Sequence, residues 1–490
     1  MKETLKRNGI FSLLQVLVTG VAYFFLYKYL LASVGAELLG VWALVLASVS
    51  SARLSDLGFS SSVVKFVAKY KAKGDVLKAG EITETALITV FSVILIVSLL
   101  VYYPIQVILG YLVPEEKISF ALLLLPYALT SLCINTVSGV MMSGLDGCQR
   151  MDIRHILLMA GVLINIGLVM SLLPEFGFIA LAYAQLVQAV LLLLASWLFL
   201  RKELSSFHLV AKWRKEHFLE IWRYAFTFQL TSFITMTYEP VTKGLLSYFG
   251  GLSMVGYYEM ASRMVMQFRS LIVSVNQIFV PAVAGIVETS PRKVKALYLS
   301  SYELFFSMNL ILCGLLAVIT LSVSELWIGT TNKEFITFSW LLIAGWMVNT
   351  FTVNAYFFNQ GTGNLRPNFI CQASIGILNV TLGVILGFIY GGYGVVAGWA
   401  VGLMAGSLLL LIRYHSDNKI PMTDIVPGSV RRLLLAVLLA LSVGILLPIS
   451  IELEGIYSLL AGAVVYGLIV TPALFMTGVG KKILSLVQVK

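Results

Sequence analysis

Charged side chains inside long apolar runs are the residues of this chain best placed to do chemistry. The segment MTYEPVTKGLL, residues 236–246, puts an acid, a proline and a base into one such run. Five bases and three acids lie within apolar runs: Lys28, Arg53, Lys243, Arg263 and Arg269, with Asp56, Glu239 and Glu259. Their net positive charge favours an anionic ligand, because guanidinium groups bind phosphate through paired, charge-assisted hydrogen bonds.

Neighbouring acids offer a simpler explanation for three of these bases. An acid lies three or four residues away in the pairs Arg53–Asp56, Glu239–Lys243 and Glu259–Arg263. At this spacing two side chains share a helical face and can neutralise one another. Neutralisation is favoured for Arg263 and stays open for the other two bases. Arg269 has no acid at these positions, so a functional role is favoured there.

Lys28 and Pro240 each have two interpretations. Lys28 lies near the outer end of its run and could either line a lumen or extend to the lipid headgroups. Pro240 removes a backbone donor and is expected to kink its helix, and within lipid the freed carbonyl needs a neighbouring chain or water. MTYEPVTKGLL is therefore expected to line a cleft, with a purely structural kink as the alternative. Tyrosines close to these charges could stack on sugar rings: Tyr23, Tyr27, Tyr238, Tyr257 and Tyr258.

The composition shows in what kind of element these residues lie. The chain has 490 residues, of which 59% are hydrophobic and 12% charged, which excludes a soluble globular domain. A spanning helix needs roughly 20 apolar residues. Fourteen such stretches begin near residues 9, 36, 82, 118, 154, 177, 225, 252, 297, 335, 369, 393, 433 and 456. The sequence thus predicts an all-α, multi-pass membrane protein with 14 transmembrane helices.

The distribution of Lys and Arg predicts the orientation. With the N-terminus in the cytoplasm, 27 of the 34 basic residues fall in the termini and in cytoplasmic loops, among them the expected loops at 60–80 and 143–155. Only Lys117 and Lys333 lie on the outer side. Both termini are therefore expected in the cytoplasm, and the protein in the inner membrane. The formal charge of +10 follows from this topology and from contact with lipid headgroups, so no nucleic-acid partner is expected. The four cysteines are interpreted as packing residues.

Weak internal similarity predicts a duplication. One constant offset along the chain relates the pairs Gly40/Gly256, Arg53/Arg269, Gly147/Gly363, Arg150/Arg366 and Gly167/Gly383, and Lys28 pairs with Lys243 one position short of it. Six spans fit this offset, so two parallel six-helix repeats are expected. The predicted domains are an N-lobe at 1–200, a basic amphipathic linker at 201–224, a C-lobe at 225–415, and a loop with two further helices at 416–490. Two such lobes with a cleft between them are typical of an alternating-access carrier.

Several segments resemble one transporter family. VGAELLGVWALVLASVSSARLSDLGFSSSVVKFVAKYKAKGD, YEPVTKGLLSYFGGLSMVGYYEMASRM, and the loops GLDGCQRMDI and GTGNLRPN are similar to segments of polysaccharide-transport (Wzx-type) flippases of the MOP superfamily. The resemblance extends over most of the first twelve spans. It implies that the spans beginning near residues 9, 36, 225 and 252 border a cationic lumen. One departure is Glu239, at a position where the family usually has Asp.

The resemblance implies a function. A flippase of this kind would move a polyprenyl-diphosphate-linked oligosaccharide from the cytoplasmic to the outer leaflet, for export of O-antigen, capsule or exopolysaccharide. It would be no enzyme and would hold no resident cofactor. A coupling ion, Na⁺ or H⁺, could be sensed by Glu239. Its partners would be the lipid-linked substrate, membrane lipids and the pathway's glycosyltransferases and polymerase, and a monomer is expected.

Two other functions remain as alternatives. A MATE-like antiporter for drugs or organic cations would need an acidic, aromatic lumen and twelve spans. A membrane glycosyltransferase, ligase or polymerase of the same pathway would need a large outer loop, whereas the longest outer connection, SVSELWIGTTNKEF, is of ordinary length. The chain has no Walker A or HExxH motif, so ATP hydrolysis and metal catalysis are not expected.

Overall fold

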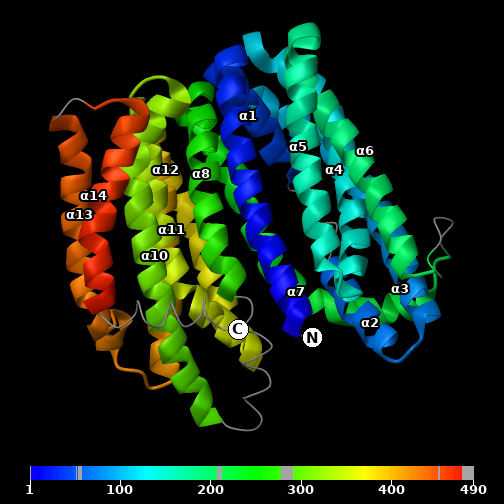
Figure 1. Ribbon diagram of the computed structural model, residues 1–490. Coiled ribbons are helices and arrows are strands. Elements are labelled where there is room, and N and C mark those ends of the chain that lie inside the picture. The colour runs from blue at the N-terminus through cyan, green and yellow to red at the C-terminus, as the bar shows by residue number, and fades with distance from the viewer. Residues whose placement is uncertain are drawn as a thin grey trace. The chain divides into compact units, whose positions relative to one another are not determined.

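The regular structure of this chain is helical throughout the part that is described. The computed structural model describes residues 2–50, 52, 58–205, 207, 212–276, 291–450 and 453–476. Its main helices are α1 (Lys2–Ser50), α2 (Phe59–Ala72), α3 (Val76–Leu112), α4 (Glu115–Gly147), α5 (Met151–Phe176), α6 (Ala180–Glu203), α7 (Lys215–Gly250), α8 (Leu252–Asn276), α10 (Pro291–Ile328), α11 (Lys333–Thr362), α12 (Arg366–Asp417), α13 (Arg431–Ser450) and α14 (Gly455–Met476) (Figure 1). This confirms the all-α membrane fold.

Two long helices are broken where the sequence predicts that one span ends and another begins. Gly35 interrupts α1 with φ 78° and ψ 170°, and Gly391 interrupts α12 with φ 60° and ψ −145°. Eight helical stretches of the described residues are long and apolar enough to cross a membrane, and some of these contain two of the expected spans. All fourteen stretches begin within described elements. The number of membrane crossings stays a prediction.

The breaks repeat along the chain with nearly the same geometry. Gly251, which follows Gly35 at the offset of the repeat, has φ 82° and ψ 171°. Gly177, which precedes Gly391 at nearly the same offset, has φ 62° and ψ −148°. Only glycine adopts such positive φ values readily, because it has no Cβ. The two halves therefore use the same two turns at corresponding places, as a parallel duplication requires.

The first compact unit covers residues 1–256. In it α4 packs against α3 and α6, α5 packs against α6, and α1 packs against α4 and α5. Helix α7, which the sequence assigns to the second half, packs here against α1, α2 and α3. The repeat-related glycines Gly40 and Gly256 lie in close contact: a Cβ on Gly40 would lie 1.9 Å from the Leu252 carbonyl oxygen, and one on Gly256 would lie 2.3 Å from that of Ala36.

Helix α2 corrects the sequence analysis, which treats residues 60–80 as a loop. The buried residues of α2 are Phe59, Ser62, Val63, Phe66, Val67 and Tyr70. This spacing of three and four puts them on one helical face, while the lysines lie elsewhere on the helix. The many charges of the segment conceal this apolar face when the sequence is considered by composition. Helix α2 packs by this face onto α3, α4 and the start of α7.

Polar contacts join α2 and α3 to the segment that the sequence predicts as an amphipathic linker. The Tyr70 hydroxyl and the Lys69 ammonium donate to Glu220 at 2.7 and 3.1 Å. Burial raises the pKa of Glu220, but these two hydrogen bonds outweigh it and hold the pKa below its usual value. Glu81 pairs with Arg214 at 2.5 Å. The linker thus passes directly into α7, whose first turns are fixed to the first unit.

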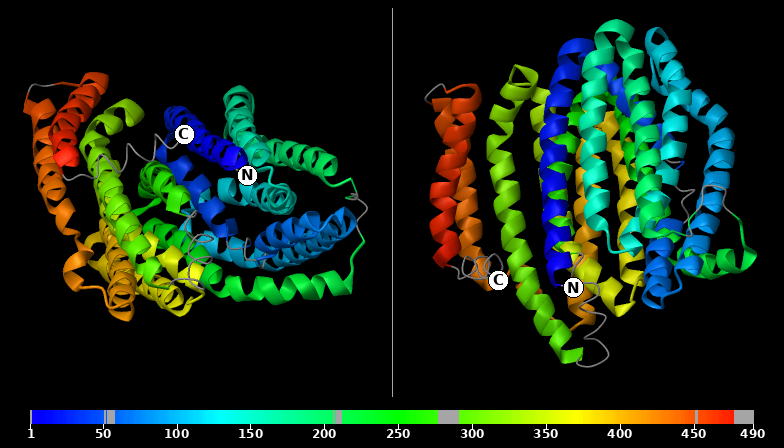
Figure 2. Two further views of the ribbon diagram at one scale, coloured as in Figure 1. Left: turned by 60° about the horizontal axis from the view of Figure 1, so that its bottom comes forward. Right: turned by 45° about the vertical axis from the view of Figure 1, so that its right-hand side comes forward.

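The second compact unit covers residues 257–490. Helix α11 packs against α10 and α12, and α13 and α14 pack against each other and against α10. Both views show α13 and α14 side by side next to α10 (Figures 1 and 2). The two helices that the sequence predicts as additions therefore attach to this unit through α10.

Helix α12 folds back on itself through a stripe of glycines. Gly394, Gly398, Gly402 and Gly406 recur every four residues, and each faces the first half of the same helix. A Cβ on Gly398 would lie 2.7 Å from the Leu382 carbonyl carbon and 2.8 Å from the Gly383 nitrogen. Small residues at this spacing let two helices approach to backbone contact in a membrane.

The glycine stripe generates a stability prediction. The variant Gly398→Ala should have a free energy of unfolding about 1–3 kcal/mol lower than that of the wild type, because backbone atoms must move to admit the methyl group. A thermal-unfolding measurement on the purified protein in detergent checks this. Gly467→Ala in α14 is the matched control, since nothing lies within 4 Å of its Cβ position. Equal unfolding temperatures for the two variants would contradict the close-contact explanation.

Candidate functional site

Arg269 of α8 lies in a polar and aromatic environment within the second unit. Its guanidinium carbon is 4.4 Å from the ring centroid of Trp346 in α11. One of its terminal nitrogens donates to Asn349 Oδ1 at 3.2 Å. The Asn349 amide in turn donates to Ser407 Oγ of α12 at 2.8 Å. Three helices therefore hold this one cation in place.

Within the described part of the chain, no acid balances the charge of Arg269. Among the described residues no carboxylate forms an ion pair with it, which agrees with the absence of acids three or four residues away in the sequence. Its Nε is buried and has no hydrogen-bond partner in the described part of the chain. A stacked guanidinium with an unused donor can accept an anion that brings its own oxygen atoms. The group of Arg269, Trp346, Asn349 and Ser407 is called the arginine site below.

Asn349 and Trp346 belong to this site, and the sequence analysis missed both. Asn349 is 8% exposed, and its amide contacts both the guanidinium and a serine. The two residues are three positions apart on α11, so they share a helical face. The sequence did contain a signal for this site: a polar residue, Asn349, lies one helical turn from a tryptophan, Trp346, inside an apolar run. A second tryptophan, Trp399 of α12, lies beside Trp346, with the two ring centroids 6.0 Å apart.

Two of the expected charge pairs are formed. Arg263 Nε donates to Glu259 Oε1 at 2.6 Å, with the Glu259 side chain 3% exposed. Lys243 Nζ donates to Glu239 Oε1 at 2.5 Å. The first pair has the neutralising arrangement that the sequence favours. The geometry by itself assigns no transport role to either pair.

The Glu239–Lys243 pair is asymmetric. The Lys243 side chain is 1% exposed, whereas that of Glu239 is 54% exposed. Helix α7 runs through Pro240, which lies between them, and is held near its end by a hydrogen bond from Ser247 to the Leu112 carbonyl of α3 at 2.6 Å. The lysine is thus enclosed by the first unit, while the acid is the member of the pair that reaches its surface.

The other predicted site residues are placed as follows. Lys28 is exposed on α1, which is compatible with both a lumen and a headgroup position. Arg53 and Asp56 lie outside the described residues. Of the two arginines related by the repeat, Arg53 and Arg269, the structure therefore describes only Arg269. Of the five tyrosines, Tyr27, Tyr238 and Tyr258 are buried, and Tyr23 and Tyr257 are half-buried. No group of three or more metal-ligating side chains occurs among the described residues.

Comparison with known proteins defines the class first and the family second. The helices form a multi-pass membrane protein with the fold of MOP-superfamily transporters. Residues 5–287 match the family described as "Polysaccharide biosynthesis protein", and the chain belongs to that family. A search of curated protein sequences gave no match.

Solved structures share the fold at low sequence identity. An inward-facing MATE-family multidrug resistance transporter of the MOP superfamily has a TM-score of 0.71 at 17% identity, covering 84% of this chain and 99% of its own. The lipid II flippase MurJ, in an inward closed conformation, has a TM-score of 0.75 at 15% identity, covering 95% and 99%. A MOP-superfamily transporter from Pyrococcus furiosus has a TM-score of 0.55 at 17% identity, covering 85% and 96%. At these identities the likeness shows the fold alone.

The asymmetric pair generates a prediction about access to water. A cysteine at position 239 should react readily with a membrane-impermeant maleimide, whereas one at 243 should react at least about tenfold more slowly because it is enclosed. The experiment uses a background in which Cys133, Cys148, Cys313 and Cys371 are replaced by serine or alanine.

Leu99→Cys is the matched control for this labelling. Leu99 of α3 is 70% exposed in the middle of an apolar run, so lipid should cover it and shield the thiol. If positions 99 and 239 are equally unreactive, Glu239 faces lipid and the expected cleft at α7 is wrong.

Proposed function

We propose that this protein is a flippase that moves a polyprenyl-diphosphate-linked oligosaccharide from the cytoplasmic to the outer leaflet of the inner membrane. The cargo would serve the export of a surface polysaccharide. The family supports a role in polysaccharide biosynthesis, and the fold supports alternating access. The observation that carries the proposal is the arginine site.

The arginine site favours a phosphate ligand for physical reasons. A diphosphate entering a membrane protein must exchange its hydration for donors of matching geometry. Arg269 has an unused buried Nε and is already oriented by Trp346 and Asn349, so little side-chain freedom is lost when an anion binds. An organic cation would be repelled by the same group.

Transfer between the leaflets would use the repeated charges in sequence. Arg53 and Arg269 are expected nearer the cytoplasmic side, where a lipid-linked substrate is made, and would bind the diphosphate first. Lys28 and Lys243 are expected nearer the outer side and would receive it as access alternates. Glu239 would sense a coupling ion, Na⁺ or H⁺, because it is an exposed acid within the apolar part of α7. The protein would act as a monomer and receive its substrate from the glycosyltransferases of the pathway.

The export of drugs or other cations is the second candidate, because several solved structures of this fold are MATE transporters. It predicts binding of a cation, whereas the arginine site offers a cation of its own. The two functions are therefore separable by the charge of the cargo.

The arginine site predicts a graded loss of function. Arg269→Ala should abolish glycan export in a complementation assay at matched membrane expression, and Arg269→Lys should restore it only in part, because an ammonium lacks the planar pair of donors. Arg413→Ala is the matched control, since Arg413 pairs with Asp417 at the exposed end of α12. Wild-type export by Arg269→Ala would exclude a diphosphate clamp at this residue.

A direct assay tests the function itself. The purified protein in liposomes should move a fluorescent polyprenyl-diphosphate oligosaccharide between the leaflets, and should not move a fluorescent lipophilic cation. Reduction with dithionite, which destroys only the outer fluorophores, measures the transfer. Arg269→Ala should reduce the initial rate at least about tenfold, the factor expected when charge-assisted hydrogen bonds worth about 1.5–3 kcal/mol are lost. Transfer of the cation in place of the glycolipid would establish the second candidate.

A further inference from the structure

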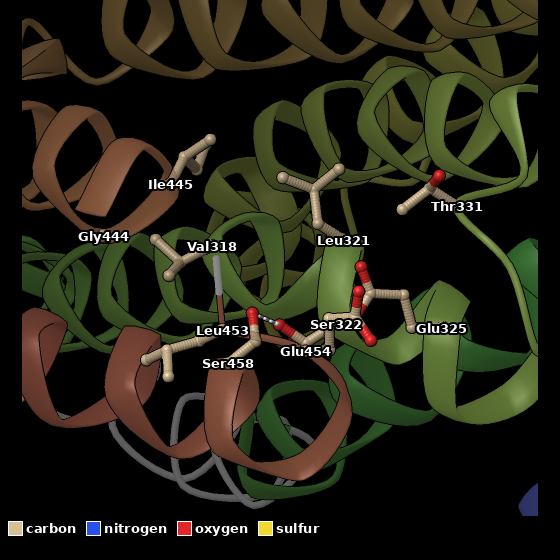
Figure 3. Close-up of a pocket in the computed structure, with 10 residues that line it drawn as sticks. All are labelled: Val318, Leu321, Ser322, Glu325, Thr331, Gly444, Ile445, Leu453, Glu454 and Ser458. Carbon is tan, nitrogen blue, oxygen red and sulfur yellow. Dashed lines mark hydrogen bonds between the residues drawn. The ribbon is translucent and has the colours of Figure 1, made fainter. Parts of the chain in front are cut away.

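A cavity of about 370 Å³ lies between α10, α13 and α14, within the second unit and apart from the arginine site. Its lining residues are Val318, Leu321, Ser322, Glu325, Thr331, Gly444, Ile445, Leu453, Glu454 and Ser458 (Figure 3). The distribution of positive charge in the sequence predicts that the end of α10 and the start of α14 lie on the outer side of the membrane. The cavity is therefore expected near the outer leaflet.

One end of the cavity carries negative charge. Glu325 Oε2 accepts a hydrogen bond from the Gly455 backbone nitrogen at 2.9 Å, which fixes the end of α10 to the start of α14. This contact brings the Glu325 carboxylate close to Glu454, the residue before Gly455. Within the described chain neither carboxylate forms an ion pair. Two neighbouring carboxylates at a membrane surface repel each other, and a bound cation relieves that repulsion.

A second polar feature lies beside the carboxylates. Ser322 Oγ and Ser458 Oγ are 2.9 Å apart, and their residues are only 4% and 7% exposed. Figure 3 shows the two hydroxyl groups directed toward each other. One hydroxyl hydrogen makes this bond, and the other has no acceptor among the described residues. A buried hydroxyl with an unused hydrogen favours a ligand that brings an acceptor oxygen.

The other end of the cavity is apolar. Val318, Leu321, Ile445 and Leu453 line it, and none of them offers a hydrogen-bonding side chain. Gly444 packs closely against Val318, since a Cβ at position 444 would lie 2.9 Å from Val318 Cγ1. From one end to the other, the cavity thus presents carboxylates, hydroxyl groups and hydrocarbon side chains. An amphiphile with a cationic head has groups that match these surfaces in the same order.

We propose that this cavity binds an outer-leaflet phospholipid with a primary ammonium headgroup. The ammonium donates hydrogen bonds to Glu325 and Glu454, a phosphate oxygen accepts from the serine pair, and the first methylenes contact Val318 and Ile445. The rest of the acyl chains extends along the surface of the protein. The site is separate from the cargo site, so it neither requires nor tests the flippase function. It would hold α10, α13 and α14 together from the outer side.

Lipid binding to the purified full-length protein tests the proposal. Native mass spectrometry measures adducts of phosphatidylethanolamine and phosphatidylcholine with matched acyl chains. The wild type should bind phosphatidylethanolamine at least about tenfold more tightly, because a trimethylated nitrogen has the same charge but no hydrogen to donate. The double variant Glu325→Gln, Glu454→Gln should bind both lipids within about twofold of each other.

Two further variants separate this site from general surface charge. Ile445→Trp should fill the apolar end and reduce phosphatidylethanolamine binding although both carboxylates remain. Glu116→Gln, which changes an exposed carboxylate at the outer end of α4, is the matched control and should leave the tenfold preference intact. If the double variant folds poorly, Glu454→Gln alone keeps the Glu325 hydrogen bond and should still lower the preference.

Three outcomes would overturn the proposal. The first is equal binding of the two lipids by the wild type. The second is unchanged phosphatidylethanolamine binding by Ile445→Trp. The third is a loss of preference in Glu116→Gln as large as that in the double variant.

Discussion

In lipid every charged or polar group must be satisfied by the protein itself, and the rest of this structure depends on that constraint. The chain meets it in two ways. Two of the basic groups inside its described apolar helices have a partner on the same helix: Lys243 pairs with Glu239 and Arg263 with Glu259. Arg269 instead has an aromatic ring and a neutral amide as neighbours. That difference leaves Arg269 with a buried Nε that has no hydrogen-bond partner among the described residues.

A neutral environment is well suited to a transport site. A carboxylate next to Arg269 would compete with an anionic cargo for the same donors. Trp346 and Asn349 orient the guanidinium without competing for it, because the ring interacts with its face and the amide oxygen with a single N–H. Under the proposed function, a diphosphate would therefore meet a donor that no acid in the described part of the chain already occupies.

Close backbone contact is the second consequence of the constraint. Helices in lipid gain little from burying apolar side chains, so they associate through van der Waals contact between small residues. The glycine stripe of α12 and the Gly40–Gly256 contact are two such places. The positive-φ glycines Gly35 and Gly391 let one long helix become two without an exposed loop between them. The same residue type therefore determines both where the helices turn and where they touch.

Much of this organisation could be predicted from the sequence, because it follows from local composition. Apolar run length predicts the helices, and the absence of an acid near Arg269 in the chain predicts that its own helix cannot neutralise it. The loop assigned to residues 60–80 was wrong, since the amphipathic face of α2 is visible only when residues are placed at helical spacing.

The partners of Arg269 were decided by tertiary structure alone. Trp346 and Ser407 lie far from Arg269 along the chain, on two other helices, and only the packing of α8, α11 and α12 brings them to the guanidinium. The burial of Lys243 beside an exposed Glu239 is a further case, because the two residues have the same helical context and differ only in what the neighbouring helices cover. Local sequence determines which groups a helix carries, and packing determines which of them meet water, lipid or each other.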